Sequence, residues 1–528
     1  MSCKAKVILQ ARTGSKRLYG KVLLPISKHE LVVLCWKRIK LSNLDVIVAI
    51  PRNKEDDYLA EVLKNNKIKF FRGDTNNVFS RFKKITSKMR PDDIIIRVTA
   101  DNPIVDGFFI KRLLNEFKEK NYNYLSAHDN LIYTPYGLQA EIFKAKHLRE
   151  KFPQNKSNLE HVTPAIRKRY LTKNKFEIKK LKKFKNLRIT IDDLNDFQRV
   201  SDIFKASSYN EKKNYLELLK NYKKKQKQFN KIKKNSNLVL GTVQLGKKYY
   251  ANTSISQNRA NKILKLAYKK GINFLDTAYD YGKAEKFIGN FSLKKQNFFS
   301  ISTKLRNFKL NKNLKEKNIQ SEINKSIFKS LKNLRTCSLD TYLIHNSNIL
   351  FNSIFVYEHI KRFINCGIIK NFGVSIYTPK EFYMLKKYKK INCVQLPFNI
   401  LDYKWKKILN TRNKKLKIFI RSIFLRGRLK QKNIEFSNNK SKYKKLIHDL
   451  NILVKKFNKK NLIDMTVAYV KSFKGINHYV FGVQNQSNLI SILNYFKTKS
   501  LKENEKNQII RTVKKYFNAK DSDLRSWN

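Results

Sequence analysis

The second half of the chain repeats one pattern eight times, and this repeat limits the possible folds more than any other feature. Short runs of β-branched and aromatic residues, typical of buried strands, alternate with helical stretches. The eight strand candidates are Leu238–Gly241, Asn273–Asp276, Phe299–Lys304, Thr341–His345, Asn371–Ser375, Cys393–Pro397, Lys417–Ser422 and Tyr479–Gly482. Eight strand–helix units in about 290 residues predict a (β/α)8 TIM barrel.

The first half also alternates strands and helices, but with fewer repeats. The strand candidates are Lys6–Gln10, Asp45–Ile50, Lys67–Phe71 and Asp93–Val98. Helical spacing covers Glu55–Lys64 and Val78–Lys88. This pattern predicts an α/β domain with a parallel sheet and crossover helices.

A Lys-rich stretch separates the two halves. Between about Lys212 and Ser236 the sequence is dominated by Lys, Gln and Asn and has no strand pattern. We interpret it as a solvated helix or linker in preference to a nucleic-acid-binding arm. A chain of 528 residues is also too long for one compact core. We therefore predict domains at 1–215 and 237–528, joined by a linker at 216–236.

The net charge of +74 is the feature most open to a second interpretation. Such a charge usually points to nucleic acid or an anionic membrane. Here the excess runs from end to end, together with heavy use of Lys, Asn, Ile, Phe and Tyr, as AT-rich coding would produce. We predict no specific nucleic-acid partner and no membrane partner, although a basic surface would help to gather nucleotides.

The cysteines and the lengths of the apolar runs indicate the cellular compartment of the protein. Cys3, Cys35, Cys337, Cys366 and Cys393 form no CxxC pair and no metal-ligand spacing, which predicts reduced thiols. No apolar leader precedes the first strand, and no run of about 18 apolar residues occurs. We expect a cytoplasmic protein; its oligomeric state is not indicated.

The first predicted strand leads directly into a basic, glycine-bearing loop, Gln10–Val22, with the sequence QARTGSKRLYGKV. Backbone N–H groups can approach phosphate oxygens where a glycine removes the side chain, and Lys and Arg neutralise them. No Walker A sequence is present. The residues that we expect to bind a nucleotide triphosphate here are Arg12, Gly14, Ser15, Lys16, Arg17 and Lys21.

The order of residues in this loop resembles the signature loop of the cytidylyltransferases that activate Kdo, sialic acid and spore-coat sugars. The resemblance covers roughly residues 1–210 and continues through 71–74, 97–103, 137–141, 160–164 and 188–196. It implies a nucleotide-diphospho-sugar transferase-like (GT-A/Rossmann-like) domain. Such a domain would use CTP and a sugar acceptor, with Arg97 and Thr99 along the nucleotide.

Two aspartates are candidates for a magnesium site. Asp101 follows the strand Asp93–Val98, and Asp192 follows a second strand-like run, Leu187–Ile191. Ligands of open α/β sheets bind at such carboxyl ends, and Mg²⁺ prefers a few carboxylates with retained water. The resemblance implies that the pair binds the metal. Taken singly, Asp101 could be a turn residue and Asp192 a helix N-cap. We interpret His161 as a structural or substrate-contacting residue.

The barrel half contains a second constellation. Its sequences Leu240–Gly246 and Phe274–Glu285 resemble the aldo/keto reductases, whose signature has Asp-Thr-Ala at the end of strand two and Tyr five residues after the Asp. That assigns Asp276 and Tyr281, whereas Tyr279 breaks the spacing. Lys304 and His345 end the next two predicted strands.

These four residues suit carbonyl reduction. Hydride transfer to a carbonyl leaves an alkoxide that needs a proton, and a Tyr with a pKa near 10 needs help to supply it. Lys304 beside Tyr281 would lower that pKa, and Asp276 would keep Lys304 charged. His345 would polarise the carbonyl. The alternative is that each residue is incidental: a core His, a rim Lys and a Tyr at the barrel mouth.

The resemblance implies NADPH or NADH as cofactor. Ser375 and Gln395 are expected at the nicotinamide carboxamide, with Arg421 and Ser422 nearby. Arg421 stands where many members place an aromatic ring, and Ile376 where many place Asn. The stretch Gly482–Asn488 lacks the basic residue that commonly binds a 2′-phosphate. The choice between the two cofactors stays open.

We therefore predict a bifunctional enzyme of surface-glycan sugar biosynthesis. One domain would form a CMP-sugar and release pyrophosphate, and the other would reduce a small, sugar-derived carbonyl. One alternative is a barrel that isomerises or eliminates without net reduction. Another is a basic polyanion-binding protein with vestigial sites.

Overall fold

The computed structural model describes residues 3–127, 134–153, 155–171, 178–225, 237–246, 255–294, 299–309, 316–411, 415–425, 429 and 440–518. The chain divides into two compact units, formed chiefly by residues 1–231 and by residues 232–528. Two segments of the second half, Asn313–Cys337 and Asn365–Ile368, are grouped with the first unit. Among the helices in the described ranges, none is both long enough and apolar enough to cross a membrane.

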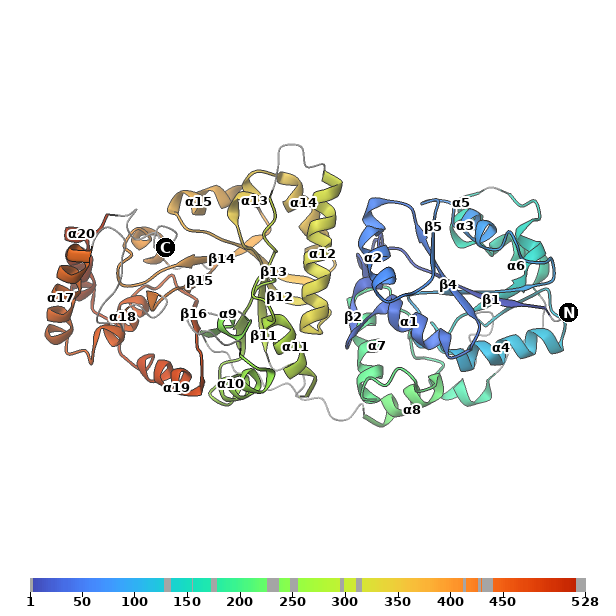
Figure 1. Cartoon of the computed structure of the whole chain (residues 1–528), viewed down its shortest axis with the longest axis horizontal. Coiled ribbons are helices and arrows are strands. Elements are labelled where there is room, and N and C mark those ends of the chain that lie inside the picture. The colour runs from blue at the N-terminus through green and yellow to red at the C-terminus, as the bar shows by residue number, and fades with distance from the viewer. Residues whose placement is uncertain are drawn as a thin grey trace. The chain divides into compact units, whose positions relative to one another are not determined.

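The first unit is built on a six-stranded sheet with the order β5-β4-β1-β6-β8-β7, of which Figure 1 labels β5, β4 and β1. The strands are β1 (Ala5–Gln10), β4 (Asp45–Pro51), β5 (Phe70–Gly73), β6 (Ile94–Thr99), β7 (Tyr124–Ser126) and β8 (Glu141–Lys144). The four predicted strands pair in parallel, but β8 runs antiparallel to both β6 and β7. The sheet is therefore mixed and not purely parallel as predicted. The prediction missed β7 and β8 because they are too short to give a strand pattern in the sequence. A separate small ribbon joins β2 (Pro25–Ile26) and β3 (His29–Glu30).

The helices of this unit follow the strands. They are α1 (Leu31–Lys40), α2 (Asp57–Asn65), α3 (Val78–Ile85), α4 (Gly107–Glu119), α5 (Lys156–His161), α6 (Pro164–Tyr170), α7 (Leu194–Ala206) and α8 (Tyr215–Lys225), with 3₁₀ turns η1 (Lys21–Leu23), η2 (Lys54–Asp56), η3 (Ala145–Leu148) and η4 (Lys179–Phe184). The predicted helix at 55–64 is thus η2 followed by α2, and the one at 78–88 ends at Ile85.

The helix α8 corrects part of the predicted linker. Leu218 and Leu219 of α8 are fully buried, and α8 packs against α7. These leucines and the buried Tyr215 form one apolar stripe, which the surrounding lysines hide in a composition reading. Residues up to Lys225 therefore belong to a packed helix, while residues 226–236 lie outside the described residues. The limits of the two domains stay predictions.

The second unit contains the predicted closed barrel of eight parallel strands. They are β9 (Leu238–Gly241), β10 (Phe274–Asp276), β11 (Ser300–Lys304), β12 (Leu339–Ile344), β13 (Ile369–Ser375), β14 (Ile391–Pro397), β15 (Lys417–Arg421) and β16 (His478–Gly482). Val239, Leu343, Cys393, Phe419 and Val480 form one buried cluster from five of these strands. Side chains thus fill the barrel interior, as in other barrels of this size.

Helices separate the barrel strands along the chain, and further helices follow the last strand, β16 (Figure 1). They are α9 (Val243–Gly246), α10 (Gln257–Lys269), α11 (Ala284–Lys294), α12 (Glu316–Leu334), α13 (Ser347–Phe351), α14 (Ile354–Asn365), α15 (Pro379–Met384), η5 (Leu385–Lys387), α16 (Lys406–Leu409), α17 (Lys440–Lys456), α18 (Leu462–Lys471), α19 (Gln486–Tyr495) and α20 (Glu503–Tyr516). All five cysteines of the chain are free thiols.

Candidate active sites

The basic loop after β1 closes on the backbone of Thr13. The Thr13 carbonyl accepts hydrogen bonds from Ser15 N at 2.8 Å and Gly20 N at 2.9 Å. The Thr13 N–H donates to Asp56 Oδ1 at 2.7 Å. Gly20 has a φ of 65°, a left-handed conformation that glycine adopts without strain, and η1 begins directly after it at Lys21. The loop therefore places Lys21 at the carboxyl end of the sheet. The buried Asp56, which sequence reasoning missed, holds the loop through the Thr13 N–H.

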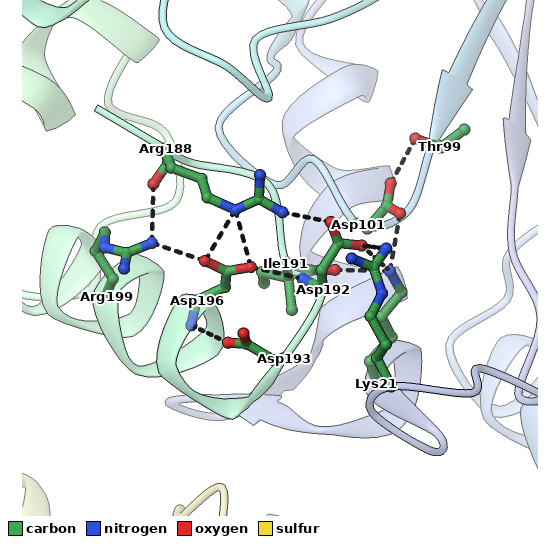
Figure 2. Close-up of polar contacts among 10 residues, drawn as sticks. Lys21, Thr99, Asp101, Arg188, Ile191, Asp192, Asp193, Asp196 and Arg199 are labelled. Atoms are coloured by element: carbon green, nitrogen blue, oxygen red, sulfur yellow. Dashed lines mark hydrogen bonds and ion pairs between the residues drawn. The ribbon is translucent and has the colours of Figure 1, made fainter. Parts of the chain in front are cut away.

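The two aspartates predicted to bind a metal converge on Lys21 (Figure 2). The Lys21 ammonium donates to Asp101 Oδ2 at 2.9 Å and lies 3.5 Å from Asp192 Oδ1. It also donates to the Ile191 carbonyl at 2.6 Å. The Thr99 hydroxyl at the end of β6 donates to the other oxygen of Asp101 at 2.5 Å. Four of the predicted nucleotide- and metal-binding residues therefore meet at one point.

The segment Leu187–Ile191 is not a strand, contrary to the prediction. Ile189 N donates to the Tyr136 carbonyl at 2.7 Å, and Ile191 N donates to the Asp101 carbonyl at 2.9 Å. The extended segment thus bonds to two different parts of the chain and never forms a ladder with one neighbour. The bond from Ile191 still sets Asp192 beside Asp101, as the prediction required.

Asp192 has two further cationic partners. Arg17 lies 2.8 Å from its Oδ1, and Arg188 forms an ion pair with its Oδ2. Arg188 also donates from Nε to both oxygens of Asp196 at 3.1 Å. The N-cap of α7 is Asp193, whose side chain accepts from Asp196 N, so Asp192 is not the cap. Sequence reasoning missed Arg188 and Asp196; their only signal was a position inside the 188–196 motif.

The donor set fits a divalent cation. Burial would raise the pKa of Asp101, but Lys21 and the Thr99 hydroxyl more than offset it and hold the pKa below its usual value. The described residues include no cluster of three or more His, Cys, Asp or Glu side chains suited to a metal. Two ionised carboxylates completed by water and phosphate oxygens are a set that Mg²⁺ commonly uses. Asp101 and Asp192 could hold such an ion.

The remaining predicted nucleotide contacts are dispersed. Arg12 pairs with Glu160 at 2.8 Å, away from the two aspartates, and Lys16 is exposed. A Cβ on Gly14 would lie 3.0 Å from Glu55 Oε2, so the loop passes close to that carboxylate. Of the basic loop residues, only Arg17 and Lys21 contact Asp101 or Asp192 in this structure.

Arg97 marks the edge of a cavity of about 640 Å³ beside Thr99. It pairs with the half-buried Glu141, which also accepts from the Tyr124 hydroxyl at 2.6 Å and Thr163 Oγ1 at 2.7 Å. Burial would raise the pKa of Glu141, but Arg97 and these hydroxyls hold the pKa below its usual value. This carboxylate, another residue missed in the sequence, fixes the orientation of Arg97.

The same cavity offers polar groups to a ligand. The amide nitrogen of Gln139 and the amide oxygen of Asn102 are buried without a hydrogen-bond partner among the described residues. His161, Arg167 and Lys168 also line the cavity, in keeping with a substrate-contacting His161. Unpaired buried amides need partners, and a polyhydroxyl ligand supplies both donors and acceptors.

At the carboxyl end of the barrel, Asp276 and Lys304 form a buried ion pair. The Lys304 ammonium donates to both oxygens of Asp276 at 2.8 Å and to the Thr277 carbonyl at 2.8 Å, which uses all three of its protons. Gln395 donates from its amide nitrogen to Asp276 Oδ1 at 2.9 Å. The pair is therefore complete without any ligand.

Tyr281 and His345 lie above this pair. The Lys304 ammonium is 5.2 Å from the centre of the Tyr281 ring, and the Tyr281 and His345 ring centres are 5.9 Å apart. Burial raises the pKa of Tyr281, and the nearby Lys304 offsets this only in part. The expected net lowering of the Tyr281 pKa is thus not found. Tyr279 instead lies beneath Arg306, whose guanidinium carbon is 5.7 Å from its ring centre.

His345 has a carboxylate neighbour that the sequence reading did not single out. Asp280 Oδ2 is 3.6 Å from His345 Nδ1 and accepts from Asn307 N at 3.0 Å. Burial lowers the pKa of His345, and Asp280 opposes this. The net direction favours a neutral imidazole, which can donate one hydrogen bond to a carbonyl oxygen.

Tyr281, Asp276 and His345 open into a cavity of about 580 Å³. The predicted cofactor residues Gln395, Arg421 and Ser422 line it as well, and Ser375 lies at the end of β13 in register with Gln395. The buried Oε1 atom of Gln395 has no hydrogen-bond partner among the described residues. An orphaned acceptor of this kind fits the amide N–H₂ of a nicotinamide.

Comparison with known families agrees with this division into two sites. The family described as Cytidylyltransferase matches residues 6–343, and the Aldo/keto reductase family matches residues 237–513. The matches overlap at residues 237–343, which contain the barrel strands β9 to β11 and all of β12 but its last residue.

Individual relatives match one half each. An uncharacterized protein of Methanocaldococcus jannaschii is 34% identical over 200 residues, which are 36% of this chain and 79% of the relative. The spore coat polysaccharide biosynthesis protein SpsF of Bacillus subtilis is 27% identical over 212 residues, 38% of this chain and 86% of SpsF. The aldo-keto reductase YhdN of Bacillus subtilis is 24% identical over 173 residues, 32% of this chain and about half (51%) of YhdN.

Proposed function

We propose that this chain, which belongs to both the cytidylyltransferase family and the aldo/keto reductase family, is a bifunctional enzyme of sugar activation. Its N-terminal unit would transfer a cytidylyl group from CTP to a sugar, and its barrel would reduce a carbonyl with NADPH or NADH. The observation that carries the proposal is that each unit holds its own polar constellation: Asp101 and Asp192 on Lys21, and Asp276 on Lys304.

In the N-terminal unit, the sugar oxygen would attack the α-phosphorus of CTP and expel pyrophosphate. Lys21 and Arg17 bring positive charge to the phosphates, and the loop closed on Thr13 offers backbone N–H groups. A Mg²⁺ held by Asp101 and Asp192 would neutralise charge on the phosphates. The cavity beside Arg97, with its unpaired amides, would orient the acceptor sugar.

In the barrel, Tyr281 would give its phenolic proton to the carbonyl oxygen as the carbon is reduced. Nicotinamide supplies the hydride when bound, so the carbonyl gains one hydride and one proton and becomes an alcohol. Lys304 supports the developing phenolate, Asp276 holds Lys304 in place, and neutral His345 donates a hydrogen bond to the carbonyl oxygen. Gln395 would accept from the nicotinamide carboxamide.

A role in surface-polysaccharide precursor synthesis in the cytoplasm is part of the proposal. It is supported by the name of SpsF and by the joining of the two activities in one chain. The direct test uses the full-length protein with CTP, Mg²⁺ and a panel of sugars, and measures pyrophosphate release. Consumption of NADPH or NADH with small carbonyls is measured in parallel. Cofactor turnover without net consumption would replace carbonyl reduction by isomerisation.

A further inference from the structure

Arg421 brings a positive charge into the barrel cavity, and no carboxylate of the described residues neutralises it. It is the last residue of β15, lines the cavity with Tyr281 and His345, and is half-buried. Among the described residues, no carboxylate or other acceptor pairs with its guanidinium. The guanidinium instead lies over the Tyr377 ring, whose centre is 4.6 Å from the guanidinium carbon.

Both carboxylates of the catalytic end have other partners. Asp276 is saturated by Lys304 and Gln395, and Asp280 accepts from Asn307 N and lies beside His345. Neither is left to balance Arg421. A half-buried arginine that lines a cavity, and that has no carboxylate partner among the described residues, gains most from an incoming anion, since charge-assisted hydrogen bonds strengthen where water is excluded.

The position of Arg421 is held from two sides. Its backbone carbonyl accepts from Phe398 N at 3.0 Å. The Tyr377 ring beneath the guanidinium follows β13, and its N–H donates to Glu381 Oε2 at 2.8 Å, within the capping box of α15. These contacts fix the position of the guanidinium. A guanidinium is planar, and its N–H groups can donate two parallel hydrogen bonds to a carboxylate or a phosphate.

Arg421 also lies close enough to the reacting groups to affect both of them. After burial and Lys304, it is a further influence on the pKa of Tyr281, which it lowers. It likewise opposes a proton on His345, whose pKa burial lowers. An anion on Arg421 would thus belong to the molecule whose carbonyl faces Tyr281 and His345.

We propose that Arg421 is the anion-recognition residue of the barrel and that the carbonyl substrate carries a carboxylate or phosphate group. This inference rests on the proposed carbonyl reduction and adds the substrate class. It differs from the expectation that Arg421 contacts the nicotinamide cofactor. The same oxyanion chemistry occurs on the cofactor phosphates, so the test must separate the two sources.

The test compares matched anionic and neutral carbonyls on the full-length protein. The pairs are succinic semialdehyde with butanal, and glyceraldehyde 3-phosphate with glyceraldehyde. We expect kcat/KM to favour the anionic member of at least one pair by about 10- to 100-fold, the usual value of a charged hydrogen bond. Arg421→Met should reduce that ratio at least about tenfold.

The matched control is Arg306→Met. Arg306 also rests on a tyrosine ring at this end of the barrel, that of Tyr279, but does not line the cavity. Its replacement should leave the anionic-to-neutral ratio within about twofold, because a charge outside the cavity is screened by solvent. An equal loss in both variants would show a general effect of surface charge and overturn the assignment.

Binding measurements separate this inference from the proposed function. Calorimetry with 4-hydroxybutanoate, in the presence of NADP⁺, should detect binding that Arg421→Met weakens, whether or not a carbonyl is reduced. If binding is seen but no carbonyl is turned over, the proposed reduction fails and the anion site stands. If Arg421→Met weakens only NADPH or NADH binding, or if neither pair shows an anionic preference and no acid binds, the inference is wrong.

Discussion

At the carboxyl end of the N-terminal sheet, the side chains of Asp101 and Asp192 are 27% and 15% exposed. Both lie beside Lys21, and Asp192 also pairs with Arg17 and Arg188. At the end of the barrel, Lys304 and Asp276 are 1% and 5% exposed, and each satisfies the other. The first set can exchange partners when a triphosphate and a cation arrive. The second set is arranged before any ligand binds, as electrostatic preorganisation requires.

The contrast has an energetic side. A buried ion pair is expensive to break, because the remaining charge is left without water or partner. A partly exposed pair contributes less to stability, because solvent partly replaces a lost partner. Mutations at the barrel pair should therefore affect folding and activity together, whereas mutations at the N-terminal pair should affect activity with little change in folding.

The largest effect should come from the barrel. Tyr281→Phe should lower carbonyl reduction by about 10²- to 10⁴-fold, the usual value of general acid catalysis, with the fold intact. Lys304→Met should be comparably inactive and should also lower the free energy of unfolding by about 3–5 kcal/mol, because it leaves Asp276 buried and unpaired. Cofactor oxidation and denaturant unfolding measure the two effects.

Tyr279→Phe is the matched control for this prediction. Its ring lies beneath Arg306, and the reduction rate should change little. An inactive Tyr279→Phe beside an active Tyr281→Phe would reverse the assignment of the proton donor.

The next effect should come from the N-terminal pair. Asp101→Ala and Asp192→Ala should each lower CTP-dependent pyrophosphate release by about 10²-fold, since metal charge stabilisation contributes several kcal/mol. Their free energy of unfolding should fall by no more than about 1 kcal/mol, the range for solvent-accessible pairs. A loss of stability as large as that of Lys304→Met would erase the contrast between the sites.

A smaller effect concerns a histidine that is buried in the barrel unit. His359 in α14 is 2% exposed, and burial, aided by Arg362, lowers its pKa to about 3. Because the unfolded chain takes up a proton near pH 6.5 and the folded chain does not, stability is full above that pH and falls toward pH 3. The loss at pH 5 should be about 2 kcal/mol.

Denaturant unfolding of the full-length protein at pH 7.5 and pH 5 measures this difference. His359→Gln, which cannot titrate, should remove about 2 kcal/mol of the pH dependence of the barrel transition. An unchanged slope in the variant would mean that His359 is accessible to protons in the folded state.

The smallest effect should follow from separating the units. Residues 1–225, which include all of α8, and residues 237–528 should each fold, and each should keep its activity within about twofold, because the two sites share no residue. Circular dichroism and the two activity assays check this. A fragment ending at residue 215 should be less stable, because it loses the buried Leu218 and Leu219. If neither half is active alone, the sites depend on one another.

Much of the barrel followed from sequence alone. Most barrel strands carry consecutive apolar residues that give a local pattern, and closure of eight parallel units puts all the strand ends on one face. Asp276, Lys304 and His345 could therefore be expected together before any coordinates were known. The pKa balance at Tyr281 could not, because it depends on how deeply the ring is buried.

The N-terminal unit left more to the tertiary structure. Strands β7 and β8 are three and four residues long, too short to give a pattern of their own, and β8 pairs antiparallel with both β6 and β7. The segment before Asp192 has a strand-like sequence but bonds to two different segments. In the same way, α8 has the composition of a linker and the burial of a packed helix.

The sequence by itself determined which residue types stand at the ends of strands, and hence the two kinds of chemistry that this chain can support. Only the tertiary structure decided which charges meet. Lys21 lies 80 positions from Asp101 and 171 from Asp192, and Arg421 ends β15 with no carboxylate opposite it among the described residues. Local sequence encodes propensity and spacing, whereas partners distant in the chain are chosen by packing, which joins them only when the whole unit is folded.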